Sequence, residues 1–300
     1  MSWSRWFIVC VVVVVASSTL IPPPALTRGQ DQPPTTQPDI IMQRDIVYGR
    51  AGDVELKLNL SRPRAHEDRL PCVIVIHGGA WRSGDRGGMH DALINTLARR
   101  GYVAVSISYR FAPEHRFPAQ IEDAKCAVRY LRAHADELKI DPDRIGAMGF
   151  SAGAHLAMLL GTMDSKDGLE GNGGWRDQSS KVRAVVAFFG PTDLLQPIPP
   201  QAMRLVEDFI GGTQESMRDQ YRRASPITYV DTGDAPMLLF HGTADPLVPW
   251  NQAVSMAEAL HQAGVPGRVE LLIGKGHGWL DEDLTRTLDQ SWAFFDRWLK

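Results

Sequence analysis

The chain has 300 residues, of which 44% are hydrophobic and 22% are charged, with 32 lysines and arginines against 35 aspartates and glutamates. This is the composition of an ordinary globular protein, and the length suits one large α/β domain. Because the charges nearly balance and form no run of one sign, the sequence argues against a nucleic-acid partner and against a stable membrane partner.

The N-terminus carries a targeting pattern. Arg5 precedes an apolar run over residues 6–16, which small residues follow. This is the layout of a secretory signal peptide, and the run is short for a membrane anchor, which needs roughly 20 apolar residues. We therefore predict a signal peptide over residues 1–18, ending no later than about 25, and a secreted or periplasmic protein. An uncleaved anchor is the less favoured alternative.

The segment after the signal peptide is rich in proline, threonine and glutamine, so residues 19–43 are predicted to be disordered and residues 44–300 to form the folded domain. The cysteines of that domain are Cys72 and Cys126. Each lies in an apolar pattern, which favours two buried free thiols. The alternative is a disulfide, which an exported protein could form.

From residue 45 onwards, strand-like and helix-like segments alternate. Residues 45–49 and 54–60 alternate apolar with polar side chains, which is typical of half-buried antiparallel strands. Denser apolar runs predict buried strands at residues 72–79, 102–109, 144–150, 182–190, 236–242 and 268–274. Helices are expected at residues 89–101, 118–138, 152–161, 252–264 and 288–299.

This alternation predicts an α/β fold in which a mostly parallel central sheet is flanked by helices. Two segments interrupt the rhythm. Residues 163–181 are a polar, glycine-rich loop, and residues 194–233 form a long excursion between two strands. Because long insertions in such folds usually carry function, the second is interpreted as a small cap insertion beside the site.

A serine between two glycines marks the candidate nucleophile. Gly149, Ser151 and Gly153 fit the pattern G-x-S-x-G where a strand pattern gives way to a helix pattern. A sharp turn there lifts the serine hydroxyl above the sheet edge, and the helix N-terminus favours negative charge. Alone, the motif is equally compatible with a glycine-rich turn, so the serine needs a base and an acid.

The candidate base is His277, because it follows a late strand within a glycine-rich loop. The candidate acid is Asp245, just beyond a buried strand, in the order serine, aspartate, histidine. Asp193 also follows a strand and is the rival acid. His155 is expected to pack behind the serine, whereas His241 ends a strand but precedes the acid.

The segment HGGAW follows another strand and predicts an oxyanion hole. Gly78 and Gly79 allow the backbone to approach a substrate, and Ala152 supplies the N–H that follows the nucleophile. Fixed donors of this kind contribute roughly 3 kcal/mol each. His77 is expected to support the loop rather than act as a base, and Asp85 to pin it by accepting backbone hydrogen bonds.

Neither a metal nor a cofactor is expected. The sequence contains no H-E-x-x-H motif and no cluster of cysteines and histidines. It also lacks a G-x-G-x-x-G segment after a strand, which argues against a dinucleotide enzyme.

Taken in order, the motifs HGGAW, GFSAGAH, HGTAD and GHGW resemble those of the α/β-hydrolases. More narrowly, they resemble the hormone-sensitive-lipase-like esterases and the feruloyl and acetyl-xylan esterase-like carboxylesterases. The resemblance covers residues 45–300, with Ala80 in place of the usual third glycine of the oxyanion loop. It implies an α/β-hydrolase fold and the following roles: nucleophile Ser151, acid Asp245, base His277, and Gly78, Gly79 and Ala152 around the oxyanion.

Residues and resemblance together predict an exported serine carboxylesterase that hydrolyses short-chain acyl esters. Small-molecule or polysaccharide esters are the expected substrates, with acetyl or feruloyl esters of plant polysaccharide as candidates. Trp81 and Trp279 either stack on a sugar or phenolic ring or pack inside the protein. The alternatives are a lipase, formamidase, lactonase or peptidase built on the same machinery, and a non-catalytic carbohydrate-binding module.

Overall fold

The computed structural model describes residues 39–300. The expected signal peptide and most of the expected proline-rich segment lie outside the described residues. Strand β1 (Ile40–Ala51) already begins inside the stretch that the composition predicts to be disordered up to residue 43. The reason is its partner, β2 (Val54–Pro63), which is long enough for Ile40 to pair opposite Pro63.

The eight strands of the described chain form one sheet in the order β1-β2-β4-β3-β5-β6-β7-β8. β1 and β2 form an antiparallel hairpin, and β2 pairs antiparallel with β4, whereas every later pair is parallel. The parallel strands therefore end at one common edge. Their bounds are β3 (Leu70–Ile76), β4 (Val103–Ile107), β5 (Ile140–Phe150), β6 (Ala184–Phe188), β7 (Met237–Gly242) and β8 (Gly267–Leu272).

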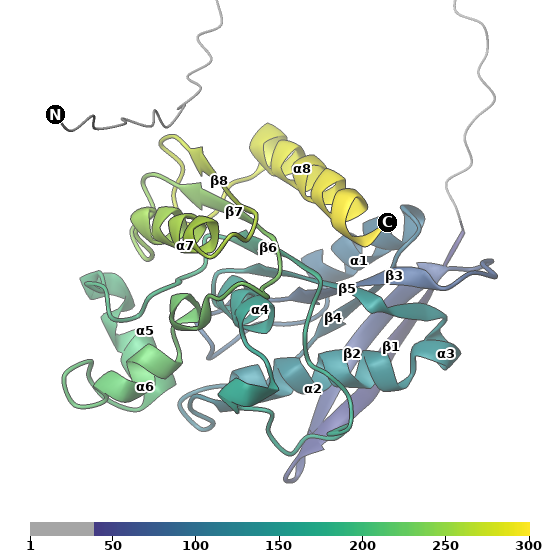
Figure 1. Ribbon diagram of the computed structural model, residues 1–300, viewed down its shortest axis with the longest axis horizontal. Helices are drawn as coiled ribbons and strands as arrows, with labels where there is room; N and C mark the ends of the chain where they lie inside the picture. The colour runs from purple at the N-terminus through teal and green to yellow at the C-terminus, as the bar shows by residue number, and fades with distance from the viewer. Residues whose placement is uncertain (1–38) are drawn as a thin grey trace, which may run out of the picture. The chain divides into compact units, whose positions relative to one another are not determined.

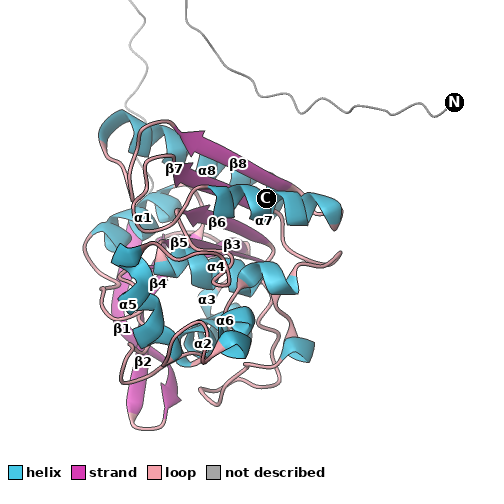
Figure 2. Ribbon diagram, turned by 90° about the vertical axis from the view of Figure 1, so that its left-hand side faces the viewer, coloured by secondary structure: helices cyan, strands magenta, loops and turns pink. Residues whose placement is uncertain are grey.

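Helices cover both faces of this sheet (Figures 1 and 2). One face packs against α1 (Met89–Arg99) and α8 (Asp281–Leu299). The other packs against α2 (Ala119–Ala133), which α3 (Ala135–Leu138) follows, α4 (Ala152–Thr162) and α7 (Asn251–Gln262). Between residues 39 and 300, no helix combines the length and the apolar character that a membrane crossing requires.

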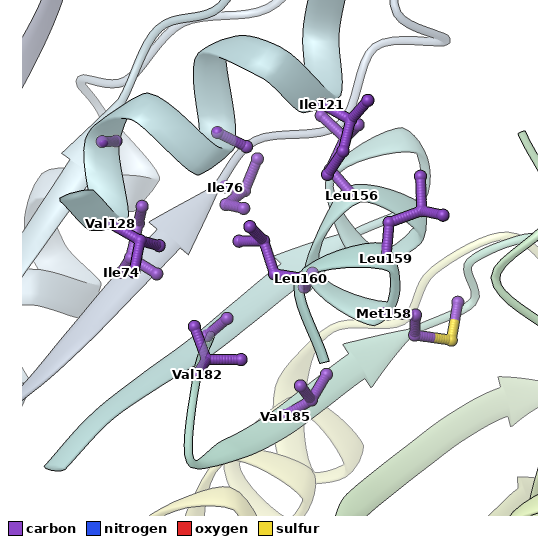
Figure 3. Close-up of a cluster of buried hydrophobic side chains, with 14 of the residues drawn as sticks. Ile74, Ile76, Ile121, Val128, Leu156, Met158, Leu159, Leu160, Val182 and Val185 are labelled. Carbon is purple, nitrogen blue, oxygen red and sulfur yellow. The ribbon is translucent and has the colours of Figure 1, made fainter. Parts of the chain in front are cut away.

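The central strand β3 shows why its sequence is apolar at every position. Ile74 and Ile76 belong to the cluster on the α2 and α4 side, whereas Val73 and Val75 belong to the cluster on the α1 and α8 side. Side chains alternate between the faces of a strand, so a sheet covered on both faces needs apolar residues throughout. Figure 3 labels part of the α2 and α4 side: Ile74, Ile76, Ile121, Val128, Leu156, Met158, Leu159, Leu160, Val182 and Val185.

Both cysteines of the described chain are buried and free, as the sequence pattern favoured. Burial raises the pKa of the Cys72 thiol and raises that of Cys126 to about 11. Both groups are therefore neutral, apolar parts of the core.

The long excursion lies between β6 and β7, in the range expected for a cap insertion. It contains α5 (Pro200–Ile210), α6 (Arg218–Arg223) and a 3₁₀ turn, Pro226–Tyr229. In Figure 1, α5 and α6 both lie to one side of the sheet. The excursion is tied to the rest of the domain, because Phe117 N–H donates to the Phe209 carbonyl at 2.8 Å.

Candidate active site

Ser151 sits in the turn that connects β5 to α4. Its backbone has φ 53° and ψ −118°, in the left-handed region that residues other than glycine rarely adopt. The flanking glycines are required by space. A Cβ at Gly149 would lie 2.2 Å from the Gly153 carbonyl oxygen, and one at Gly153 would lie 2.1 Å from that of Ile76. The motif therefore encodes a crowded turn that holds the serine in a strained position.

The structure brings together the three residues that the sequence assigned to the triad. Ser151 Oγ donates to His277 Nε2 at 2.7 Å, and His277 Nδ1 donates to Asp245 Oδ2 at 2.7 Å. The rival acid, Asp193, is engaged elsewhere, because its carboxylate accepts from the backbone N–H of Leu195 at 2.9 Å. The geometry is that of a serine whose proton has a direct acceptor.

Asp245 is held from four directions. Its Oδ1 accepts from the backbone N–H groups of Leu247 at 2.8 Å and Val248 at 3.0 Å. Its Oδ2 faces His277 at 2.7 Å and His241 at 3.3 Å. Burial opposes ionisation, but the hydrogen bonds from His241, His277 and Val248 prevail and hold the pKa of Asp245 well below its usual range. The carboxylate is charged and cannot rotate.

Sequence reasoning missed the part that His241 plays. Its Nε2 also donates to the Val248 carbonyl at 2.9 Å, and the residue is 1% exposed. Its other ring nitrogen, Nδ1, is buried and has no partner within residues 39–300. The signal was available in the segment HGTAD, where a histidine at the end of β7 stands four residues before the acid. The expected order along the chain places the base after the acid. This order excludes His241 as the base but leaves it free to contact the acid.

A second aromatic side chain adjoins the base. The ring of Phe189 lies edge-on to His277, with centroids 4.8 Å apart, and its backbone has φ 44°. Trp279 packs against Phe189 at 5.2 Å and donates from its indole nitrogen to Thr287 Oγ1 at 3.0 Å. Phe189 and Trp279 thus form a wall beside the His277 ring.

Of the two interpretations of Trp81 and Trp279, the structure favours packing. Trp279 is 9% exposed and Trp81 is 4% exposed. Trp81 stacks on Phe209 of the cap at 4.2 Å and donates to His155 Nδ1 at 3.2 Å. Both indoles are largely covered by protein side chains, and what remains open of Trp81 faces the pocket beside Ser151.

The loop after β3 is buttressed as the sequence suggested. His77 is 2% exposed, donates from Nδ1 to the Gly78 carbonyl at 2.7 Å and stacks on Tyr109 at 4.4 Å. Burial lowers the pKa of His77 to about 4, so it is neutral and supports the loop. Asp85 accepts from the Gly87 N–H at 2.6 Å, which pins the far side of the same loop.

The predicted oxyanion residues lie against the nucleophile turn. A Cβ on Gly78 would be 2.9 Å from the Phe150 carbonyl oxygen, and one on Gly79, with φ 109°, would be 2.0 Å from that of Ser83. Within the described chain, the backbone N–H groups of Gly78, Gly79 and Ala152 donate no hydrogen bond. They are therefore free to serve as donors to a substrate oxygen.

A pocket opens beside Ser151 and His277. Its walls come from the oxyanion loop, the segment after β6, the cap helix α5 and the segment after β7. The remaining lining residues are Ala80, Trp81, Pro191, Leu194, Ile198, Pro199, Ala202, Leu205, Val206, Leu247, Val248, Pro249 and Gln252. The surface is almost entirely apolar, which suits the hydrocarbon part of a small ligand.

The expectation of a metal-free site stays a prediction. Over residues 39–300, no three histidine, cysteine, aspartate or glutamate side chains converge as a metal would need.

A mostly parallel sheet, a strained serine turn after its central strand and a Ser–His–Asp chain of hydrogen bonds together define an α/β-hydrolase. The class is narrowed by comparison with known proteins. The chain belongs to the BD-FAE family, whose family model matches residues 58–260.

Among curated relatives, the chain is 34% identical over 223 residues to esterase LipC of Mycobacterium tuberculosis, a match covering 72% of this chain and 55% of LipC. The chain spans about half the length of the curated relatives it matches.

Solved structures with a similar fold also include esterases. A bifunctional GH43-CE protein of Bacteroides eggerthii superposes with a TM-score of 0.76 at 34% identity, covering 86% of this chain and 38% of that one. A butyrate-bound esterase of Thermogutta terrifontis, Est2, superposes with a TM-score of 0.72 at 29% identity, covering 88% of this chain and 95% of that one.

Proposed function

We propose that the protein is an exported serine carboxylesterase. The observation that carries the proposal is the continuous chain of hydrogen bonds from Ser151 through His277 to Asp245 at the mouth of an apolar pocket. Relatives and structural neighbours that carry the name esterase support the reaction class. The signal-peptide pattern of residues 1–18 supports export.

The first half of the reaction forms an acyl-enzyme. Ser151 Oγ attacks the ester carbonyl carbon while His277 Nε2 takes the hydroxyl proton. The carbonyl oxygen becomes negative, and the N–H groups of Gly78, Gly79 and Ala152 stabilise it. The carbonyl re-forms, the bond to the alcohol oxygen breaks, and the imidazolium of the histidine returns its proton to that oxygen.

The second half hydrolyses the acyl-enzyme. A water molecule attacks the acyl carbon, His277 takes its proton, and the bond to Ser151 Oγ breaks as the proton moves on to the serine. The carboxylic acid then leaves. Throughout, Asp245 stays ionised and stabilises the imidazolium, which requires the low carboxyl pKa that its four hydrogen bonds produce.

For the substrate, we propose short acyl esters, with acetyl or feruloyl esters of plant polysaccharide as the natural class. The pocket beside Ser151 is small and apolar, which supports a small acyl or aromatic group rather than a long alkyl chain. The structural neighbours include a carbohydrate esterase from gut microbiota and an esterase solved with butyrate bound. Both neighbours support this substrate class.

A substrate panel tests the proposal. The purified protein is assayed against p-nitrophenyl esters from acetyl to dodecanoyl, methyl ferulate and acetylated xylan, with Ser151→Ala as the blank. We expect the highest kcat/KM between acetyl and butyryl, together with release of acetate from xylan. Faster hydrolysis of long-chain triglyceride than of p-nitrophenyl butyrate would favour a lipase instead. Hydrolysis of amides or lactones without hydrolysis of esters would favour a peptidase, a formamidase or a lactonase.

A further inference from the structure

One polar side chain interrupts the apolar wall of the pocket beside Ser151 and His277. It belongs to Gln252, which stands in the first turn of α7 and is 4% exposed. Every other lining side chain, apart from the serine, the histidine and the indole of Trp81, is purely apolar. A buried amide in such surroundings is expected to be hydrogen-bonded at both ends.

The orientation of this amide is set by its neighbours. Gln252 Oε1 accepts from the backbone N–H of Thr192 at 2.8 Å and from that of Asp193 at 3.1 Å. Because both partners are donors, the oxygen must face them and the NH₂ group must lie on the opposite side. The hydroxyl of Thr192 also donates to the Gln252 carbonyl at 2.8 Å, which locks the two segments together.

The NH₂ group is left without a protein partner. Within residues 39–300, Gln252 Nε2 donates no hydrogen bond. It is also not among the fully buried side-chain atoms of these residues that lack a partner, so protein does not enclose it completely. The residue lines the pocket and its Nε2 is not fully enclosed by protein, which directs the two N–H groups towards the pocket. They form a fixed pair of donors in an apolar wall, where an unpaired donor is costly and a paired one is selective.

We propose that Gln252 is a specificity-determining residue. Its Nε2 donates a hydrogen bond to an acceptor oxygen on the substrate group that fills the pocket. The preferred substrates are thus esters whose acyl or alcohol part carries an ether, carbonyl or hydroxyl oxygen, rather than plain alkyl esters of the same shape. This inference rests on the proposed esterase function and adds the chemistry of the group in the pocket.

Matched pairs of substrates test the inference on the unaltered protein. On the acyl side, p-nitrophenyl methoxypropanoate is compared with p-nitrophenyl pentanoate, which replaces the ether oxygen with a methylene. On the alcohol side, methoxyethyl acetate is compared with butyl acetate. Each ratio of kcat/KM is divided by the ratio of the alkaline hydrolysis rates, which removes the intrinsic reactivity. We expect a corrected preference of about fivefold to tenfold for the ether in one series, and that series identifies which part enters the pocket.

Gln252→Glu then replaces the donor with an acceptor oxygen and, when the carboxyl is ionised, adds a negative charge. A glutamate keeps one oxygen for the N–H groups of Thr192 and Asp193 and presents an oxygen where the NH₂ group was. The corrected preference should fall to about one or reverse, whatever happens to the two rates separately. Gln262→Glu is the matched control, because it makes the same change at an exposed position near the end of the same helix and should leave the preference intact.

The outcomes separate the two proposals. A corrected ratio of about one in both series for the unaltered protein overturns the role of Gln252 while leaving the esterase intact. So does a preference that survives in Gln252→Glu. A merely structural role would slow both members of a pair equally and leave their ratio unchanged. Absence of hydrolysis of every ester in both series overturns the esterase function itself.

Discussion

His241 and His277 meet at a single oxygen atom: both contact Asp245 Oδ2, at 3.3 Å and 2.7 Å. The other carboxylate oxygen is taken by two backbone N–H groups, so the carboxylate plane is fixed. Because His277 can reach Asp245 only along the remaining direction, its ring is presented to Ser151 in one orientation. His241 thus acts through Asp245 as a positioning residue.

We predict that His241→Phe lowers kcat about tenfold with little change in KM, because the carboxylate loses one of its four fixed partners. His241→Gln, which can still donate, should retain more of the activity. Steady-state kinetics of both variants on p-nitrophenyl acetate measures the difference. Equal loss in both variants, with a shared fall in melting temperature, would reduce His241 to a packing residue.

Two substitutions of Ser151 distinguish its role in catalysis from the backbone strain at this position. Ser151→Ala and Ser151→Gly should both lose at least about four orders of magnitude in kcat. They should differ in stability, because the position has φ 53° and glycine tolerates this backbone better than alanine. We expect the free energy of unfolding of Ser151→Gly, measured by urea denaturation, to exceed that of Ser151→Ala by about 1 kcal/mol. Equal stabilities would mean that the turn is unstrained.

The two candidate acids are distinguished by the same change. Asp245→Asn should lower kcat about 10⁴-fold, because an amide nitrogen in place of an oxygen faces donors and disturbs the tautomer of His277. Asp193→Asn should change kcat less than about threefold, since the carboxylate of Asp193 only accepts local hydrogen bonds. Kinetics of the pair on one ester decides, and the opposite ranking would transfer the acid to Asp193.

Two buried histidines should make the stability of the fold depend on pH. Burial lowers the pKa of His77 and of His155 to about 4, against about 6.5 in an unfolded chain. Between these values the unfolded state binds more protons at these two histidines, so their contribution to the free energy of unfolding is full above about pH 6.5 and is lost as the pH drops towards 4. Asp234, whose pKa burial raises to about 7, contributes with the opposite sign over this range.

Urea denaturation at several pH values between about 4 and 6.5 measures how the free energy of unfolding depends on pH and which histidine is responsible. His155→Gln, which can still accept from Trp81 and donate to the Ala224 carbonyl, should lower the slope by up to about 1.4 kcal/mol per pH unit. His261→Gln, at an exposed position on α7, is the control. A slope that stays the same in His155→Gln would mean that His155 is protonated in the folded protein.

The cap should set the length of chain that the pocket accepts. Leu205 of α5 lines the pocket, whereas Met203 on the same helix is 46% exposed and does not. Leu205→Ala should raise the kcat/KM of octanoyl relative to butyryl esters several-fold, since each buried methylene contributes about 0.8 kcal/mol. Met203→Ala should leave the ratio unchanged. No change in Leu205→Ala would mean that the acyl chain lies elsewhere.

Much of the fold and the triad could be predicted from the sequence because both follow from local patterns. Runs of β-branched residues between helical segments predicted the parallel strands. In this fold, chemistry-bearing residues follow strands whose ends share one edge, so Ser151, Asp245 and His277 could be proposed from their motifs, their order along the chain and the resemblance. The glycines around the serine also had a local meaning, because the backbone there has no room for a Cβ.

What escaped prediction depends on contacts between distant segments. The position of β4 between β2 and β3 follows from pairing, which no local pattern encodes. The amide of Gln252 acquires its orientation from Thr192, sixty residues earlier in the sequence, so nothing near it marks its role. Trp81 resembled a sugar platform only because the cap residue that covers it, Phe209, lies far away along the chain.

His155 joins three parts of the domain that the chain visits at widely separated points. It accepts from Trp81 of the oxyanion loop, stands on the helix behind the nucleophile and donates from Nε2 to the Ala224 carbonyl in the cap at 2.6 Å. Grafting a cap from a relative with a different substrate would therefore disturb the loop that carries the predicted oxyanion residues, unless Trp81, His155 and a carbonyl in place of that of Ala224 are kept. When related proteins evolve a new substrate preference, we expect substitutions of side chains that line the pocket, such as Leu205, to come first. Changes in the length or path of the cap should be rare.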